Sequence, residues 1–418
     1  MRTTGRRLRR GVTVGVALAL VALSVPAATA TGSTATGSTA TGSTVPSKVH
    51  QPWLWQATVE QRPAGPAALV FFTSRTRFLE STGVLVGRDG GYRLIPLHVG
   101  EDHGLLSPDG RHYLRPSGEL LDLTTGQQHR PIHTGMQPLA WSPDGHRVLS
   151  TRSNDDAVIS YGPDNQQLND PEKPDDLLVL DPYRGTERVV AAGTFAAHTA
   201  AAWSPGGDLV AVAGPADVPA SIAERQRLVV VDPTNGSVRW QVELGDRRML
   251  AGPAAWHPDG RRIALLAFDG CAGLRCTSEQ VAARTWRIEF LDAATGHAVG
   301  QPLPVAASTT EIVGWRGVDP VVKQSVVADG DDRRAVLAAV SPGGGRDVLV
   351  TAPPGSTDLA VPGELLARAA FGGPEPRPSP FAAPLWLYLA LAVPTLAAIA
   401  LLVRRLRRER PADPVPST

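Results

Sequence analysis

Through the middle of the chain, short apolar runs alternate with polar turns. Runs such as Leu228–Val231 and Ile263–Ala267 are rich in valine, leucine and isoleucine, and glycine, proline or aspartate bounds them. Runs of this length between turn signals are typical of strands rather than of helices. The pattern therefore predicts an all-β domain of many short strands.

Two turn phrases alternate between these runs. The first reads Ser-Pro-Asp-Gly or a close variant, mostly after a tryptophan, at Ser107–Gly110, Trp141–Gly145, Trp203–Gly207 and Trp256–Gly260. The second has an aspartate and, four residues later, a glycine, at Leu121–Gly126, Leu180–Gly185, Val231–Gly236 and Leu291–Gly296. Proline fixes φ, aspartate accepts from nearby backbone N–H groups and glycine supplies a positive φ, so each phrase predicts a tight turn. Alternating turns at a fixed order predict four-stranded repeats, and such a repeat is one blade of a β-propeller.

The repeats predict a six-bladed propeller. A degenerate first repeat is expected at Pro66–Val99. A degenerate sixth repeat contains Trp315 and the turn Val340–Gly344. The clear repeats between them span 103–134, 138–192, 200–245 and 251–305. We expect the tryptophans of the first phrase to pack between blades, and Val49–Trp55 to supply a closing strand or to plug one end.

The Trp-Ser-Pro-Asp-Gly turn resembles that of the TolB-type, WD-like propeller repeats of bacterial envelope proteins. The chain departs from true WD repeats because no Gly-His or Trp-Asp pair ends its blades. The resemblance implies the propeller fold. By analogy with TolB it also implies recognition of a partner protein, although propellers in general host many functions.

The first residues are typical of a secretory signal peptide, which we expect at 1–30. Arginines precede an apolar run, and the small residues Ala28–Ala30 offer a cleavage site. An uncleaved membrane anchor is the alternative. Residues 31–48 repeat threonine, glycine and serine and predict a flexible linker before the propeller, which is expected at 49–352.

The end of the chain predicts a membrane anchor. Residues 353–380 are rich in proline and glycine, which predicts a semi-rigid stalk. Residues 381–403 contain no charged residue and are long enough to cross a bilayer as one transmembrane helix. Five arginines follow in the tail 404–418, and this bias predicts a cytoplasmic C-terminus with the propeller on the extracytoplasmic side of the cell membrane.

Composition and motifs bound the chemistry. The formal net charge is only +1 over 418 residues. This near-neutral balance argues against a nucleic-acid-binding protein, which usually carries an excess of positive charge. The chain has no Gly-x-Ser-x-Gly nucleophile motif and no room for a second catalytic domain, so we predict no catalytic residues. Several histidines gather in one stretch without a cysteine or a close carboxylate pair, and we predict neither a metal nor a cofactor there: His98, His103, His112, His129 and His133.

The two cysteines, Cys271 and Cys276, are the only ones in the chain. An exported chain meets an oxidising compartment, so we predict that they form a disulfide. Two free thiols are the alternative.

The longest insertion, Ser153–Asp176, is the candidate binding rim. It is acidic, with carboxylates at Asp155, Asp156, Asp164, Asp170, Glu172, Asp175 and Asp176. Their spacing is not that of a calcium-binding loop, so a solvated loop is expected. Because loops on a rigid scaffold often carry function, we predict a membrane-anchored propeller that binds an unknown envelope protein or surface ligand without catalysis. The alternatives are an extracellular sensing subunit of a signalling complex and, less favoured, a propeller enzyme.

Overall fold

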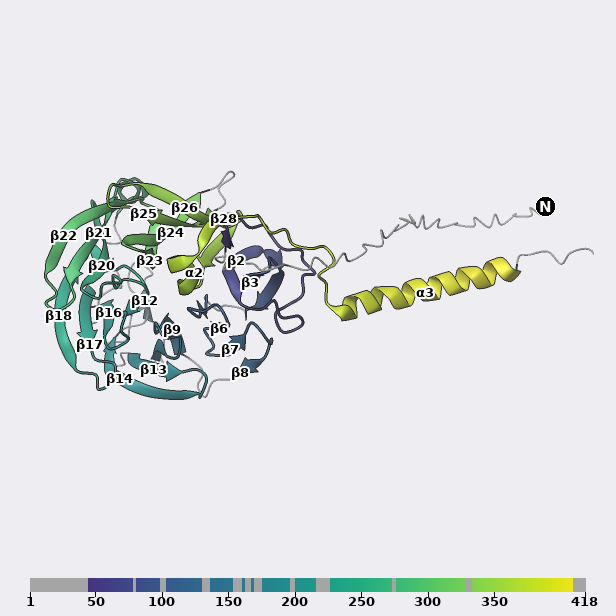
Figure 1. Ribbon diagram of the computed structural model, residues 1–418, viewed down its shortest axis with the longest axis horizontal. Coiled ribbons are helices and arrows are strands. Elements are labelled where there is room, and N and C mark those ends of the chain that lie inside the picture. Colours follow the sequence, from purple (N-terminus) through teal and green to yellow (C-terminus); the bar gives the residue numbers. More distant parts are fainter. Residues whose placement is uncertain are drawn as a thin grey trace, which may run out of the picture. The chain divides into compact units, whose positions relative to one another are not determined.

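The computed structural model shows six four-stranded antiparallel sheets arranged as a ring, which confirms the six-bladed propeller (Figure 1). The predicted signal peptide and most of the predicted linker lie outside the described residues. The structure describes residues 44–77, 80–97, 103–129, 136–152, 160–161, 167–168, 175–195, 200–215, 226–272, 276–327 and 333–408.

Each blade runs from an inner strand near the axis to an outer strand, as β14, β18 and β22 show at the rim of Figure 1. The first three blades are β27 (Ser356–Ala360), β2 (Ala67–Arg77), β3 (Glu80–Gly87) and β4 (Tyr92–Pro96); β5 (Leu105–Leu106), β6 (His112–Leu114), β7 (Leu120–Asp122) and β8 (Gln128–His129); and β9 (Met136–Trp141), β10 (Val148–Arg152), β13 (Asp175–Asp181) and β14 (Thr186–Phe195). The other three are β15 (Ala200–Trp203), β16 (Val210–Pro215), β17 (Gln226–Val231) and β18 (Val238–Gly245); β19 (Arg248–Leu250), β20 (Arg262–Asp269), β21 (Thr285–Asp292) and β22 (Ala298–Val305); and β23 (Thr309–Arg316), β24 (Asp319–Val327), β25 (Arg333–Val340) and β26 (Arg346–Thr351).

Smaller elements flank the blades. Two short sheets pair β1 (Thr44–Pro46) with β28 (Ala370–Gly373) and β11 (Ser160–Tyr161) with β12 (Gln167–Leu168). The helices are α1 (Ser278–Ala282), α2 (Gly363–Arg368) and α3 (Leu385–Arg408).

The ring closes in the first blade with a strand from the C-terminal side. Strand β27 pairs antiparallel with β2, from Val70 opposite Ala360 to Thr73 opposite Ser356. The expectation that Val49–Trp55 supplies the closing strand is therefore wrong. The predicted stalk is also wrong over residues 356–373, which form β27, α2 and β28. The prediction weighed the proline and glycine content of this stretch and overlooked its apolar side chains. Four of them are buried and pack these elements against the propeller: Leu359, Val361, Leu365 and Leu366.

Alternating strand directions give the propeller two distinct faces. We call the turn face the one that carries the links from the first to the second and from the third to the fourth strand of each blade. The loop face carries the links from the second to the third strand and from one blade to the next. Both repeated phrases lie on the turn face, because they join β5 to β6, β7 to β8 and their equivalents.

The turn phrases act as expected from their chemistry. In the first, Ser107 Oγ donates to Asp109 Oδ1 at 2.6 Å, and the backbone N–H of Arg111 donates to the same oxygen at 3.0 Å. Gly110 then takes a φ of +72°, which a side chain would disfavour. The turn thus satisfies its own polar groups within a few residues of sequence.

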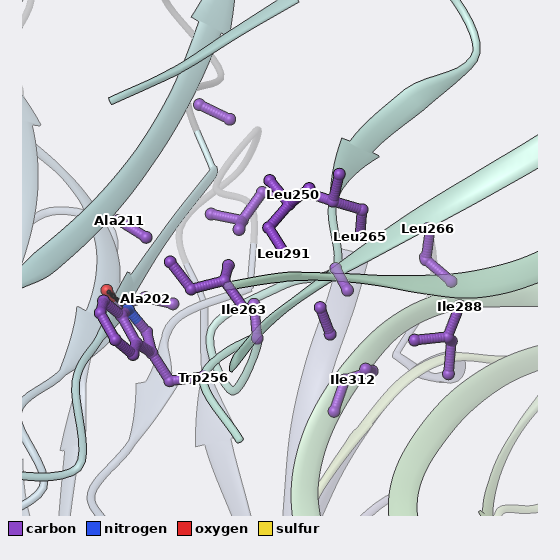
Figure 2. Close-up of a cluster of buried hydrophobic side chains, with 14 of the residues drawn as sticks. Ala202, Ala211, Leu250, Trp256, Ile263, Leu265, Leu266, Ile288, Leu291 and Ile312 are labelled. Carbon is purple, nitrogen blue, oxygen red and sulfur yellow. Dashed lines mark hydrogen bonds between the residues drawn. The ribbon is translucent and has the colours of Figure 1, made fainter. Parts of the chain in front are cut away.

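The tryptophans of the first phrase tie neighbouring blades together. The indole Nε1 of Trp203 donates to the Ala140 carbonyl at 3.2 Å, and that of Trp256 donates to the Ala202 carbonyl at 3.1 Å. Trp315 repeats the contact with Ala254 at 2.8 Å. All three are buried, and Figure 2 shows Trp256 beside Ala202 at the edge of an aliphatic cluster. The interpretation of the tryptophans as buried between blades is confirmed for Trp203, Trp256 and Trp315, whereas Trp141 is only half-buried.

One helix in the described part of the chain is long and apolar enough to cross a membrane. Residues Leu385–Arg405 of α3 have a mean hydropathy of 2.2, and none of that window is buried. Helix α3 begins four residues after the start of the predicted span at Phe381.

Candidate functional site

The inner strands surround a cavity of about 340 Å³ near the axis. Strands β5, β9, β23 and β27 line it, and residues that follow β19 complete the wall. Most of the lining is apolar, as at Leu106, Leu139, Val313 and Leu359. The cavity wall therefore combines apolar side chains with a group of polar ones.

Three charged side chains meet in this wall, and we call them the cavity cluster: Lys323, Glu311 and Asp358. The Nζ of Lys323 lies 2.5 Å from Asp358 Oδ1 and also contacts the Glu311 carboxylate. Lys323 and Glu311 come from the sixth blade, whereas Asp358 comes from the closing strand of the first blade. The cavity cluster therefore bridges the seam at which the ring closes.

The cavity cluster keeps its lysine charged. Burial by itself lowers the pKa of Lys323, but the charges of Glu311 and Asp358 outweigh it and raise the pKa above its usual value. The two carboxylates therefore favour the charged form of Lys323 at neutral pH. With one ammonium beside two carboxylates, the cluster favours cations and hydrogen-bond donors over anions.

The two ends of the cavity differ. At the loop-face end, His103 stacks on Phe72 with ring centroids 4.3 Å apart, and its Nε2 lies 3.1 Å from Thr357 Oγ1. At the turn-face end, the backbone N–H of Glu364 in α2 donates to the Pro108 carbonyl at 3.1 Å. Helix α2 thus reaches from the closing strand to the second blade, and Figure 1 shows it close to the axis. The helix therefore lies at the turn-face end of the cavity, and His103 lies at the loop-face end.

The predicted acidic rim is only partly described. Asp175 and Asp176 do not belong to a solvated loop, because both are buried in β13. Asp176 forms an ion pair of 3.0 Å with Arg152, which also contacts Glu187 at 2.6 Å. The prediction of a loop is wrong for these two residues, which lie in a strand that pairs with β10 and β14. The other candidates lie outside the described residues: Asp155, Asp156, Asp164, Asp170 and Glu172.

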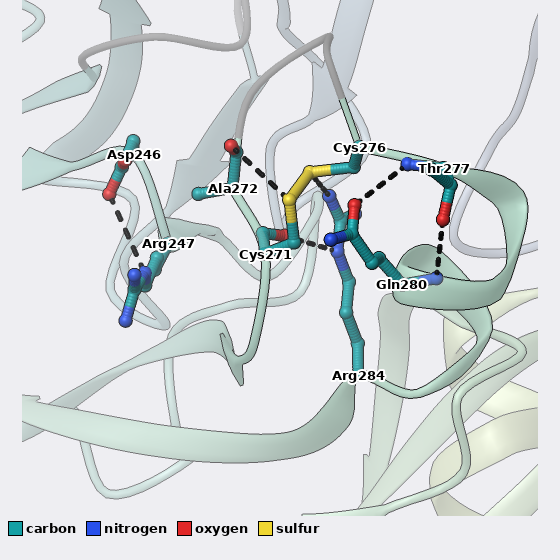
Figure 3. The surroundings of a disulfide bond; sticks show 8 residues. All are labelled: Asp246, Arg247, Cys271, Ala272, Cys276, Thr277, Gln280 and Arg284. Carbon is teal, nitrogen blue, oxygen red and sulfur yellow. Dashed lines mark hydrogen bonds and ion pairs between the residues drawn. A yellow bond between two sulfur atoms is a disulfide. The ribbon is translucent and has the colours of Figure 1, made fainter.

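The link between β20 and β21 on the loop face carries the disulfide. The sulfurs of Cys271 and Cys276 are bonded at 2.07 Å (Figure 3). Arg284 donates from Nε to the Cys271 carbonyl at 2.8 Å, and a capping box between Thr277 and Gln280 starts helix α1. The described part of this link is therefore held by contacts between residues of the link itself.

Of the described histidines in this stretch, His103 and His112 lie at different places and His129 is exposed at the end of β8. His103 lines the cavity, whereas His112 packs against Tyr183 near the turns of the second and third blades, with ring centroids 5.0 Å apart. His98 and His133 lie outside the described residues. Among the residues that the structure describes, no group of three or more His, Cys, Asp or Glu side chains could hold a metal ion.

Sequence reasoning missed the cavity cluster. Glu311, Lys323 and Asp358 are each more than ten positions apart in the sequence, and they come from three different strands. The only sequence signal is Lys323 itself, which interrupts the apolar run Pro320–Val322 of a central strand.

Comparison with known proteins gives similarity of fold. No protein-family model matches the sequence, and no curated protein matches it. The solved structure of TolB from Acinetobacter baumannii matches 71% of this chain and 66% of its own, with a TM-score of 0.44 and 17% identity. A putative TolB from Agrobacterium tumefaciens matches 69% of this chain and 90% of its own, with a TM-score of 0.42 and 16% identity. Hydrazine synthase from Kuenenia stuttgartiensis matches 66% of this chain and 77% of its own, with a TM-score of 0.44 and 15% identity.

Proposed function

We propose that this protein is a membrane-anchored, extracytoplasmic propeller that binds another envelope component at its loop face, without catalysis. The observation that carries the proposal is the asymmetry of the two faces. Short repeated turns and α2 occupy the turn face, whereas the Ser153–Asp176 insertion and the disulfide loop belong to the loop face.

The chemistry of the cavity supports binding over turnover. Its lysine is protonated and held by two carboxylates, so it is a poor general base. The remaining wall is largely apolar, which suits the insertion of a side chain or a small cationic group from a partner. The five carboxylates of the insertion that precede Asp175 would add negative charge to the same face.

The anchor and its orientation are part of the proposal. The apolar helix α3 would cross the membrane, and the arginines that follow Val403 would stay in the cytoplasm because flanking arginine sets orientation. Protease added to intact, wall-stripped cells should then digest the propeller and spare an epitope placed after Thr418. Digestion of the epitope with protection of the propeller would contradict this orientation.

The binding face is tested by site-specific photo-crosslinking in cells. A crosslinking amino acid replaces Val281, which is 42% exposed in α1 on the loop face, or Val318, which is 61% exposed on the turn face. The proposal expects a discrete crosslinked product from position 281, or from the insertion at position 164, and none from position 318. Products from position 318 alone would place the binding surface on the turn face.

A further inference from the structure

The residues just before the membrane helix are bound to the first blade in a regular way. Four alternate carbonyls in this segment accept hydrogen bonds from the propeller and its N-terminal extension. Tyr92 Oη donates to Pro376 at 2.8 Å, Trp53 Nε1 to Pro378 at 3.1 Å, Trp55 Nε1 to Pro380 at 2.8 Å and the Ala57 N–H to Ala382 at 3.0 Å. We call residues 376–382 the strap.

Charge and burial reinforce the strap. Burial raises the pKa of Tyr92 to about 12, so its hydroxyl keeps the proton that it donates to the strap at any ordinary pH. Beside it, Glu375 lies within 3.7 Å of Lys48 and 3.5 Å of His50. The strap is therefore attached along its length rather than free as a stalk.

The strap presents a cluster of exposed apolar side chains. Trp53 and Trp55 stack with ring centroids 5.1 Å apart, yet they remain 43% and 40% exposed. Leu54 between them is 57% exposed, and Phe381 of the strap is 71% exposed. Both indole N–H groups already have carbonyl partners, so the rings can leave water without losing a hydrogen bond.

The position of this cluster along the chain identifies what covers it. From Ala382, which is bonded to Ala57, only three residues lead to the start of α3 at Leu385. Three extended residues span at most about 11 Å, and the headgroup zone on each side of a bilayer is about 5–8 Å thick. If α3 crosses the membrane, the cluster lies in the headgroup zone or directly beside it, where tryptophan is enriched.

We propose that Trp53, Leu54, Trp55 and Phe381 form a lipid-contacting surface that sits in the membrane interface and holds the outer edge of the first blade against the bilayer. This inference rests on the proposed membrane anchoring by α3. It replaces a propeller that stands away from the membrane with one that is seated on it.

The test uses the full chain in phospholipid vesicles with an environment-sensitive NBD label at Leu54→Cys. The native cysteines are bonded to each other and do not take the label. The matched control is Val318→Cys, at a position that is also exposed, on a turn between β23 and β24. Nitroxide lipids that carry the quencher near the headgroup should reduce the emission at position 54 by about twofold and leave position 318 nearly unchanged.

Flotation of the vesicles after a carbonate wash separates two failures. If the chain floats with the vesicles and position 54 is no more quenched than position 318, the lipid-contacting surface is wrong while the anchor stands. A blue-shifted emission at position 54 without quenching by nitroxide lipid would mean that protein covers the cluster, and it would also overturn the inference. If the chain does not float, the anchor and the surface that rests on it are both wrong.

Discussion

The two faces of the propeller are specified in different ways. On the turn face, polar groups of the repeated phrases find partners within a few residues, as Ser142 does when its Oγ accepts from the Arg147 N–H at 2.9 Å. At the loop-face end of the cavity, Lys323 of the sixth blade depends on Asp358, thirty-five positions later in the chain. Local partners leave a repeated phrase in the sequence, whereas distant partners leave single residues without a pattern. This contrast predicts that removing a contact between two blades costs more stability than shortening a loop that belongs to no blade.

The strongest test of the turn face is Trp203→Ala. The variant removes a buried indole from between two blades and should lower the free energy of unfolding by about 3–5 kcal/mol. Trp203→Phe is the matched control, since it keeps an aromatic ring and loses the hydrogen bond to Ala140 and part of the packed volume, for about 1–2 kcal/mol. A denaturant titration measures both. A loss below about 1 kcal/mol for the alanine variant would mean that these tryptophans do not hold the blades together.

The cavity cluster tests the closure of the ring. Lys323→Met leaves Glu311 and Asp358 facing each other without the ammonium, and it should cost about 3 kcal/mol. The triple variant Lys323→Met, Glu311→Gln, Asp358→Asn removes every charge and should recover much of that loss. Thermal or chemical unfolding compares the two. Equal losses in both variants would show that packing, and not charge, holds the seam.

The repeated turns explain how much of the fold the sequence predicts. Each turn uses proline, aspartate and glycine for a fixed geometric purpose, so the count of six blades follows from reading the phrases. The closing strand did not follow, because Ser356–Ala360 has no turn phrase of its own and pairs with β2, which lies near the other end of the chain. The high proline and glycine content of residues 353–380 as a whole led to the prediction of a stalk.

The candidate site was less predictable for the same reason. A cavity between inner strands depends on which residues the ring brings together, and neither Glu311 nor Asp358 stands out among its neighbours. Asp175 and Asp176 show the opposite error, because an acidic stretch suggests a solvated loop although Arg152 on the paired strand holds Asp176 within the sheet. The disulfide was accessible to sequence reasoning, since only two cysteines were available.

The aspartates of the second phrase make the stability of the turn face depend on pH. Hydrogen bonds from Thr295 lower the pKa of Asp292, and those from Thr234 lower the pKa of Asp232. A carboxyl group whose pKa is lower in the folded state contributes stability above its unfolded pKa of about 3.9, and that stability is lost as the pH falls through the folded value. The denaturation midpoint should therefore fall as the pH drops from about 5 to about 3. In Asp292→Asn, which keeps an acceptor oxygen without the charge, the fall should be smaller; an identical pH profile would contradict the assignment.

The smallest effect on stability, and the sharpest on function, is expected from deletion of residues 155–174 on the loop face. The flanking strands are already paired, with Arg152 opposite Asp176. The deletion leaves Ser153, Asn154 and Asp175 between these paired residues, enough for a three-residue hairpin loop. It removes the ribbon of β11 and β12, which belongs to no blade. Because a shorter loop costs less entropy to close, we expect a loss of stability no greater than about 1 kcal/mol.

The same deletion should abolish the crosslinked product from position 281 if the insertion forms part of the binding rim. A matched control replaces the carboxylates of the insertion with their amides, Asp155→Asn, Asp156→Asn, Asp164→Asn, Asp170→Asn and Glu172→Gln, and so removes charge while it keeps length. Loss of the product in both variants would assign binding to the charge, whereas loss only in the deletion would assign it to the shape of the insertion. If the folded deletion variant still gives the product at full yield, the partner binds another part of the loop face. The two faces would then differ in stability but not through a binding role of the insertion.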